Sequence, residues 1–203
     1  MKTIVQQLVQ NNLDDYKIVL VPHEDLLHKI IELRQQFATE QQLEQPMQGI
    51  PELVLARFKQ LPFAEQRIKN RLKVVAMGRP AIKVELKDFG SFPSHTIFIN
   101  VTSKVPLTEL IKMIRQETQR LMKPDAENKP HFLTDFYIPL AVKLKPWQYE
   151  QGWQQYSHKH FTGKFIASKM LLLKKKHGEF KFKPVEAFDF QNLPVETKQG
   201  LLF

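Results

Sequence analysis

The chain has 203 residues, of which 42% are hydrophobic and 25% charged, so it can bury the core of one domain or of two closely packed lobes. It contains no cysteine, which excludes disulfide frameworks, thiolate nucleophiles and cysteine-bound zinc. With 30 Lys and Arg against 21 Asp and Glu, its formal net charge of +9 favours a polyanionic partner, RNA or DNA first.

The opening sequence MKTIVQQLVQNNLDDYK has no sustained apolar run before its glutamines and asparagines. It is therefore not typical of a secretory signal, and no later segment approaches the length of a transmembrane helix. These features predict a cytoplasmic protein without a membrane anchor.

In the first half of the chain, apolar spacing predicts alternating strands and helices. YKIVLVP (16–22) is β-rich and ends at a proline, and the apolar residues that follow recur at helical spacing up to residue 37. A polar loop over 38–49 leads to a strand at 50–58, IPELVLARF. A second helical stripe over 68–75 ends near Gly78, where glycine and then proline stop a helix.

The second half begins with two strands, 81–89 and 95–101, which are separated by a turn and predict a hairpin. A helix over 107–121 and a loop over 123–130 follow. The strand at 136–144 contains Pro139, so we expect that proline at an edge or bulge. A short helix over 146–156 precedes a final long hairpin, formed by 161–174 and 180–188 around the sequence HG.

The predicted order is β-α-β-α-β-β-α-β-α-β-β, which suggests two similar halves. The chain has seven glycines and neither G-x-G-x-x-G nor a Walker A pattern, so nucleotide binding of the Rossmann or P-loop type is not expected. The fold class predicted is α/β in the wider sense (α+β), with antiparallel-rich sheets. We expect one bilobal domain over 1–203 with a C-terminal tail at 191–203.

One basic segment carries most of the excess positive charge. Between Ser157 and Lys183 there are eight lysines and a single acidic residue, Glu179. This predicts a surface that faces nucleic acid, although a solvated lysine-rich hairpin without a partner would show the same pattern. The candidate nucleic-acid-binding residues are Lys174, Lys175, Lys176, Lys181 and Lys183.

Five segments, in this order, resemble the 2H phosphoesterase superfamily, and in particular its 2′-5′ RNA ligase-like and cyclic phosphodiesterase proteins. They are YKIVLVP, IPELVLARFKQL, FGSFPSHTIFINV, FYIPLAVKLKPWQYEQGW and HFTGKFIASKMLLLKK. The resemblance covers nearly the whole chain. It implies a bilobal fold in which two antiparallel-rich sheets, flanked by helices, surround a central groove.

Members of that family carry two His-x-Thr motifs, one in each lobe, and use the two histidines as general acid and general base on a phosphodiester. On a strand, residues i and i+2 point to the same face, so imidazole and hydroxyl reach one phosphate. The resemblance places the first motif at Glu52 and Val54 and the second at Tyr137 and Pro139. None of these four positions therefore keeps the histidine or threonine of the family motif.

These replacements predict that the inherited chemistry is lost. A proton shuttle must titrate near neutrality, and glutamate with an ordinary pKa of about 4.3, or tyrosine with one of about 10, does not do so. A carboxylate at position 52 also repels a phosphate. We expect a protein that binds RNA or a nucleotide without cleaving it. The alternatives are an active 2′,3′-cyclic phosphodiesterase or ligase-like enzyme with relocated groups, and a scaffold that binds a protein partner through the tail at 191–203.

The remaining histidines offer weaker candidates for relocated catalysis. His160 and Thr162 read literally as His-x-Thr, and His95 and His131 lie near the relevant strands. In the family, however, the corresponding segments are structural. His158 and His160 share a strand face, but two ligands without a carboxylate make a poor metal site. No catalytic residue, metal or cofactor is predicted.

Overall fold

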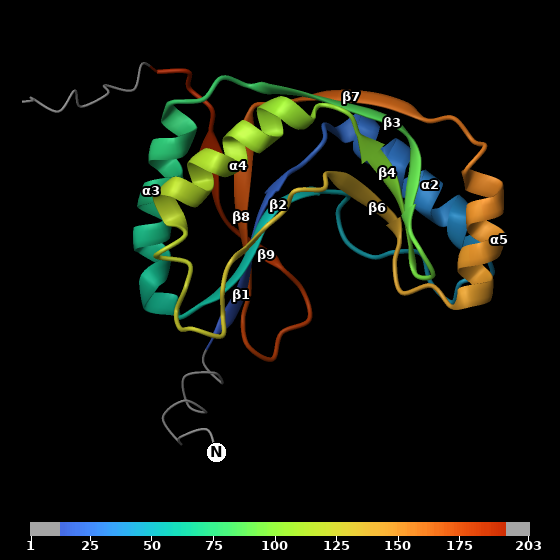
Figure 1. Cartoon of the computed structure of the whole chain (residues 1–203), viewed down its shortest axis with the longest axis horizontal. Helices are drawn as coiled ribbons and strands as arrows, with labels where there is room; N and C mark the ends of the chain where they lie inside the picture. Colours follow the sequence, from blue (N-terminus) through green and yellow to red (C-terminus); the bar gives the residue numbers. More distant parts are fainter. Residues whose placement is uncertain (1–12, 194–203) are drawn as a thin grey trace, which may run out of the picture.

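The computed structural model describes residues 13–193, which fold into two antiparallel sheets between two pairs of helices (Figure 1). The first sheet has the order β5-β2-β1-β8-β9, and the second has the order β6-β4-β3-β7. The strands of the first sheet are β1 (Asp14–Leu20), β2 (Leu53–Gln60), β5 (His131–Phe132), β8 (Lys169–Lys175) and β9 (Lys183–Asp189). Those of the second sheet are β3 (Ile82–Phe92), β4 (Thr96–Val101), β6 (Tyr137–Ala141) and β7 (Thr162–Ala167).

The helices cover the outer flanks of the two sheets. Helices α3 (Glu65–Met77) and α4 (Lys104–Thr118) pack together against the first sheet, and the short 3-10 helix η1 (Pro62–Ala64) leads into α3. Helices α2 (Glu24–Glu40) and α5 (Pro146–Tyr156) pack against the second sheet (Figure 1). Within residues 13–193, each sheet therefore keeps one face without a helix, which is called its inner face below.

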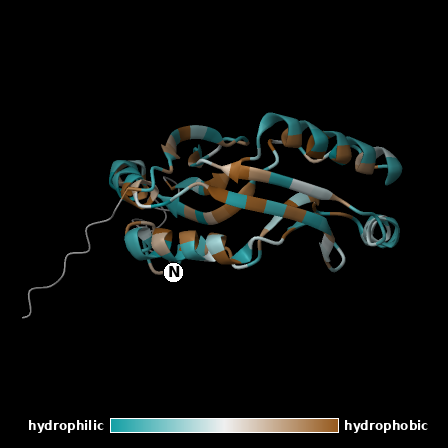
Figure 2. Ribbon diagram, turned by 90° about the horizontal axis from the view of Figure 1, so that it is seen from above, coloured by the Kyte–Doolittle hydropathy of each residue, from teal (hydrophilic) through white to brown (hydrophobic). Residues whose placement is uncertain are grey.

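Apolar spacing explains why each element buries one face. On α2, the buried residues Leu26, Ile30 and Phe37 are four and seven positions apart, which is about one and two helical turns. On β3, the buried residues Ile82, Val84 and Leu86 alternate with exposed ones. Seen from above, hydrophobic positions lie along the strands and on the sides of the helices that face them (Figure 2). The apolar core therefore lies between each sheet and its own helix pair.

The structure confirms the fold class, the two antiparallel sheets and the flanking helices. Its elements follow the predicted order, except that the two-residue strand β5 and the 3-10 helix η1 are added and two strands, β7 and β8, replace the first arm of the final hairpin. Pro139 lies on β6, which pairs only with β4, and the ladder shifts by one residue beside it. The proline that looked unsuitable for a strand thus occupies an edge strand, where its missing N–H leaves no ladder bond unmade.

The predicted final hairpin is wrong in its first arm. Residues 161–174 do not form one strand: the chain leaves the second sheet after β7, passes Ser168 and enters the first sheet as β8. Strand β7 pairs with β3, and only β8 forms a hairpin with β9. Each part alternates with the same period of two, and only the phase changes at Ser168, from buried Phe165 and Ala167 to buried Met170 and Leu172.

The predicted tail divides into two parts. Backbone N–H groups of Gln191, Asn192 and Leu193 donate to the carbonyls of Ala76, Arg79 and Met77 at the end of α3. These three residues are thus held against the first lobe. Residues 194–203, which hold most of the segment expected to bind a protein partner, lie outside the described residues.

Candidate functional site

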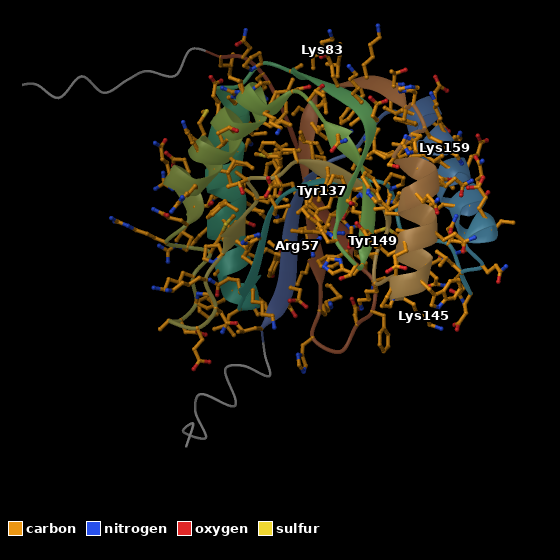
Figure 3. All side chains as sticks on the ribbon, turned by 45° about the vertical axis from the view of Figure 1, so that its right-hand side comes forward. Arg57, Lys83, Tyr137, Lys145, Tyr149 and Lys159 are labelled. Carbon is orange, nitrogen blue, oxygen red and sulfur yellow. The ribbon has the colours of Figure 1, made fainter. Side chains whose placement is uncertain are left out.

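The strands that carry the two proposed motif positions meet at the centre of the molecule. Strand β2 of the first sheet and strand β6 of the second contact each other. Glu52 immediately precedes β2, and Tyr137 begins β6. Figure 3 shows Tyr137 and Arg57, which lies on β2, near the middle of the molecule between the flanking helices. The geometry is compatible with the expected pair of facing motifs.

Glu52 is tied to a cation of the neighbouring strand. Its carboxylate accepts a hydrogen bond from Lys17 Nζ and forms an ion pair with it, and both side chains are 15% exposed. Its hydrogen-bond partner is thus Lys17, not the Tyr137 hydroxyl that faces it in the expected pairing. Because the pair is largely shielded from water, its attraction is stronger than that of a surface ion pair. The carboxylate neutralises the nearest cation of the first sheet.

Arg34, on the buried face of α2, connects the loop before β2 with strand β6. It is 3% exposed. Its Nε and Nη2 donate to the Pro139 carbonyl at 3.1 and 2.8 Å, and its Nη1 donates to the Gly49 carbonyl at 2.9 Å. Burial lowers the pKa of its guanidinium to about 10, and the nearby Glu52 charge opposes that shift. Arg34 therefore stays charged at neutral pH and joins the approach to β2 to the edge strand β6.

Tyr137 belongs to an aromatic cluster on the inner face of the second sheet. Its ring lies 5.1 Å from that of Phe92 and 4.8 Å from that of Phe98, and those two rings are 4.8 Å apart. With the Asn100 amide and the Lys104 ammonium, these rings line a pocket of about 440 Å³, here called the aromatic pocket. This volume falls in the range of small-ligand sites, and the lining combines apolar rings with a few polar groups.

Gly90 makes room for one wall of this pocket. It lies opposite Phe98 on the neighbouring strand. A Cβ at position 90 would stand 2.5 Å from Phe98 Cε2 and 2.5 Å from Asn100 Oδ1, closer than nonbonded atoms approach. The missing side chain thus lets the Phe98 ring and the Asn100 amide lie across β3.

A group of cations occupies the inner face of the first sheet. Cross-strand partners project from the same face, and the register places Arg57 opposite both Lys17 and His131, and Lys59 opposite Asp15. On the other face, Tyr16 and Phe58 are opposite each other, buried and stacked at 5.1 Å. The alternation of the strands therefore separates an aromatic core face from a charged inner face.

The charged face borders a second pocket, of about 370 Å³, here called the basic pocket. Its charged lining consists of Arg57, Lys59, Lys129, Lys175, Asp15 and Glu127. The Phe182 ring completes it and lies under two ammonium groups, 4.2 Å from Lys17 Nζ and 5.4 Å from Lys175 Nζ.

The five lysines proposed for nucleic-acid binding do not share one face. Lys174 is ion-paired with Asp14 at 3.1 Å and with Glu65 at 2.9 Å, toward the helices. Burial alone would lower the pKa of Lys174, but its hydrogen bonds to Glu65 and Asp14 outweigh that effect and raise it.

The other four lysines differ in their partners and in their exposure. Lys175 pairs with Asp15 in the basic pocket, and Lys183 pairs with Glu179. Lys176 and Lys181 are exposed. Only Lys175 thus lines a pocket on the inner face.

The histidines considered for relocated catalysis lie apart. His160 is 90% exposed on its side chain and stands 3.3 Å from the Asp88 carboxylate. The His95 ring is hydrogen-bonded through Nδ1 to the hydroxyl of the adjacent Thr96. His131 is exposed on β5, opposite Arg57. Within residues 13–193 no group of three or more His, Cys, Asp or Glu side chains is arranged to hold a metal ion. The same part of the chain has no helix that is both long and apolar enough to cross a membrane.

Several central residues were missed by the sequence reasoning, although three of them left a signal. Arg34 interrupts the apolar stripe between Ile30 and Phe37, where a charge must be buried. Arg57 and Lys59 alternate with buried residues on β2, which marks one polar face. Nothing in the sequence indicated that Phe92 and Phe98 meet Tyr137.

Comparison with solved structures identifies the fold. E. coli LigT in its apo form superposes with a TM-score of 0.60 at 11% identity, over 88% of this chain and 98% of that one. The chain has a LigT-like fold. TT0787 of Thermus thermophilus gives a TM-score of 0.57 at 11% identity, and a protein described as a phosphoesterase gives 0.53 at 15%. Each covers 87% of this chain and 98% of its own. No protein-family model and no curated protein matches the sequence.

Proposed function

We propose that this chain is a non-catalytic nucleotide-binding protein that uses the aromatic pocket of a 2H phosphoesterase fold. The observation that carries the proposal is the place of Tyr137. The residue at the second motif position packs with Phe92 and Phe98 into an aromatic wall beside the Asn100 amide. Such a wall suits a nucleobase, since the aromatic rings can stack on the base and the amide can both donate to and accept from the edge of the base.

The charges around the motif positions support binding without turnover. General acid–base cleavage of a phosphodiester needs two groups that exchange protons near neutral pH. At position 52 the structure has a carboxylate engaged with Lys17, and at 54 and 139 it has Val and Pro, which offer no side-chain donor. Lys87 and Lys104 line the same pocket as Tyr137 and can contact a phosphate, while Asp88 and Asp135 line it as well and balance their charge.

The fold relatives support the ligand class. Solved structures of E. coli LigT include complexes with phosphate, 3′-AMP and ATP. They superpose on this chain with TM-scores of 0.59, 0.56 and 0.53. A nucleotide is thus the ligand class that both the pocket and the relatives suggest.

Calorimetry with 3′-AMP, together with an assay of 2′,3′-cyclic nucleotide hydrolysis, tests the proposal. We expect measurable binding that falls at least tenfold in Tyr137→Ala, a loss of about 1.4 kcal/mol or more, because stacking on an aromatic ring contributes about 1–3 kcal/mol. Lys104→Gln should also weaken binding, and its substitution leaves the rings in place. Trp147→Ala removes a 50% exposed aromatic outside the pocket and should bind normally.

Two results would overturn the proposal. One is equal binding by wild type and by both pocket variants, or none by wild type, which removes the aromatic pocket as a nucleotide site. The other is hydrolysis by the wild type well above background, which shows that other groups perform the chemistry. Loss of that hydrolysis in His160→Ala would locate them.

A further inference from the structure

A groove on the outer flank of the first sheet is separate from both pockets described above. It has a volume of about 690 Å³ and is lined by α3, by the end of α4 and by the turn after α4. Helix α3 turns its buried residues Ile68 and Leu72 toward the first sheet, so the exposed residues of the groove face away from that sheet. Figure 1 shows α3 and α4 together at the left, beyond the first sheet. The groove is called the arginine groove below.

Two ion pairs show that α3 and α4 run antiparallel. Arg71 pairs with Glu117 at 3.5 Å, and Arg79 pairs with Glu109 at 3.4 Å. From the first pair to the second, the residue number rises by eight from α3 into the turn after it and falls by eight along α4. The start of α3 therefore lies beside the end of α4, and residues from these two ends line the arginine groove together.

The arginine groove carries positive charge that the described part of the chain does not neutralise. Its charged lining consists of Arg67, Arg71, Arg120 and Glu117. The single carboxylate is already paired with Arg71. Within residues 13–193, neither Arg67 nor Arg120 forms an ion pair with a carboxylate. Two guanidinium groups are therefore left to bind a partner of opposite charge.

The use of arginine distinguishes this groove from the lysine-rich surfaces of the chain. Of the 30 Lys and Arg residues only seven are arginines, and three of these seven line the groove. A guanidinium is planar, binds a carboxylate through two parallel hydrogen bonds and is less strongly hydrated than an ammonium. Arginine is accordingly enriched at protein–protein interfaces, where lysine is depleted. The composition of the groove is thus that of a protein interface.

Exposed apolar side chains adjoin these arginines. Val74 lines the groove three positions after Arg71 and is 46% exposed. Phe63, in η1 directly before α3, is 79% exposed and lies four positions before Arg67. Aromatic residues and arginines are the side chains that most often dominate the binding energy of a protein interface. The apolar groups favour a protein partner, because a phosphate backbone would gain little from covering them.

We propose that the arginine groove binds an acidic α-helix of a protein partner. Arg67 and Arg71 are one turn apart on α3, about 6 Å along its axis, which is also the interval between Glu or Asp side chains one turn apart on a partner helix. Arg67 and Arg120 bind the carboxylates of that helix, and an apolar side chain between them packs on Val74. The site is remote from the aromatic pocket, so the two sites bind independently.

Fluorescence anisotropy with a labelled peptide tests the proposal. The peptide has about 16 residues, enough to be helical, and carries Glu at every fourth position with Leu between. It should bind wild type and bind more weakly as salt is added. Arg67→Gln/Arg120→Gln should lower its affinity about fivefold or more, since close charge pairs at an interface are strongly coupled. Glu117→Gln should raise it roughly twofold to fivefold, because Arg71 is then released.

The controls separate the groove from the general charge of the helices. Lys73→Gln/Lys112→Gln removes two exposed lysines of α3 and α4 that do not line the groove, and should bind the peptide as wild type does. Val74→Glu keeps every arginine but adds a carboxylate to the groove, and should weaken binding. The same peptide with Gln in place of each Glu should not bind. Circular dichroism checks that each variant is folded.

Four results would overturn the proposal. The first is an acidic peptide that does not bind, or that binds wild type and the Arg67/Arg120 variant equally. The second is equal binding of the Gln peptide. The third is RNA of the same charge that binds more tightly than the peptide and loses affinity in that variant, which would assign the groove to nucleic acid. The fourth is a dimer in sedimentation that the variant abolishes, which would make the occupant a second copy of this chain.

Discussion

Replacement of Arg34 by methionine tests whether the buried guanidinium holds the two motif strands together. Methionine keeps most of the apolar volume but cannot donate, so the Pro139 carbonyl loses both of its guanidinium bonds. An unsatisfied buried carbonyl costs about 1–3 kcal/mol, and Glu52 also loses a neighbouring cation. Two effects reduce the total: the Gly49 carbonyl is on an exposed residue that water can reach, and the desolvation of Arg34 is relieved.

The sum is a loss of about 2 kcal/mol in the free energy of unfolding, or about 4–8 °C in Tm for a chain of this size. Urea denaturation followed by circular dichroism measures it. Arg34→Lys keeps a cation near Glu52 but lacks the planar fork, so it should lose less than Arg34→Met. Gln35→Met alters the adjacent exposed position and should stay within about 0.5 kcal/mol of wild type. An Arg34→Met protein as stable as wild type would contradict the argument, because the bonds to Pro139 would then contribute nothing.

Three other substitutions test local packing and charge. Gly90→Ala should destabilise the second sheet by about 1–3 kcal/mol and weaken 3′-AMP binding, because its Cβ meets the Phe98 ring; unchanged binding and unfolding would contradict the close approach. Lys174→Met should cost about 3 kcal/mol in urea unfolding at pH 7, since Asp14 and Glu65 lose their shared cation, and a neutral effect would show that these carboxylates find water instead. For Glu40, burial alone would raise the carboxyl pKa, but hydrogen bonds from Gln36, Tyr156 and Lys159 outweigh it, so the folded-state pKa is lowered. The stability that the Glu40 carboxylate contributes is present above the ordinary glutamate pKa and is lost as the pH falls through the lowered value. Glu40→Gln should therefore destabilise the protein more at pH 7 than at pH 3. An equal loss of stability at both pH values would refute the lowered pKa of Glu40.

The sequence predicted the fold well because local patterns determine most of it. The helices over 24–40 and 146–156 and the edge position of Pro139 follow from spacing and from the missing proline N–H. The break at Ser168 was missed because the period of two continues on both sides of it, and its one signal is a shift of phase from buried Phe165 and Ala167 to buried Met170 and Leu172.

The site was less predictable because it depends on contacts between distant segments. The family resemblance marked Glu52 and Tyr137, but their partners Lys17 and Phe92 lie 35 and 45 positions away. The lysine-rich segment suggested one charged surface. Alternation instead directs Lys174 and Lys175 to opposite faces, and that separation appears only once the strand register is known.

The interleaving of the two sheets limits how the lobes can move. Within residues 13–193 the chain changes sheet between β2 and β3, β4 and β5, β5 and β6, and β7 and β8. No single cut divides such a chain into one fragment per sheet, and the last change is made by Ser168 alone. Four connections of this kind disfavour a hinged opening of the two sheets, so we expect the distance between their inner faces to stay nearly constant when a ligand binds.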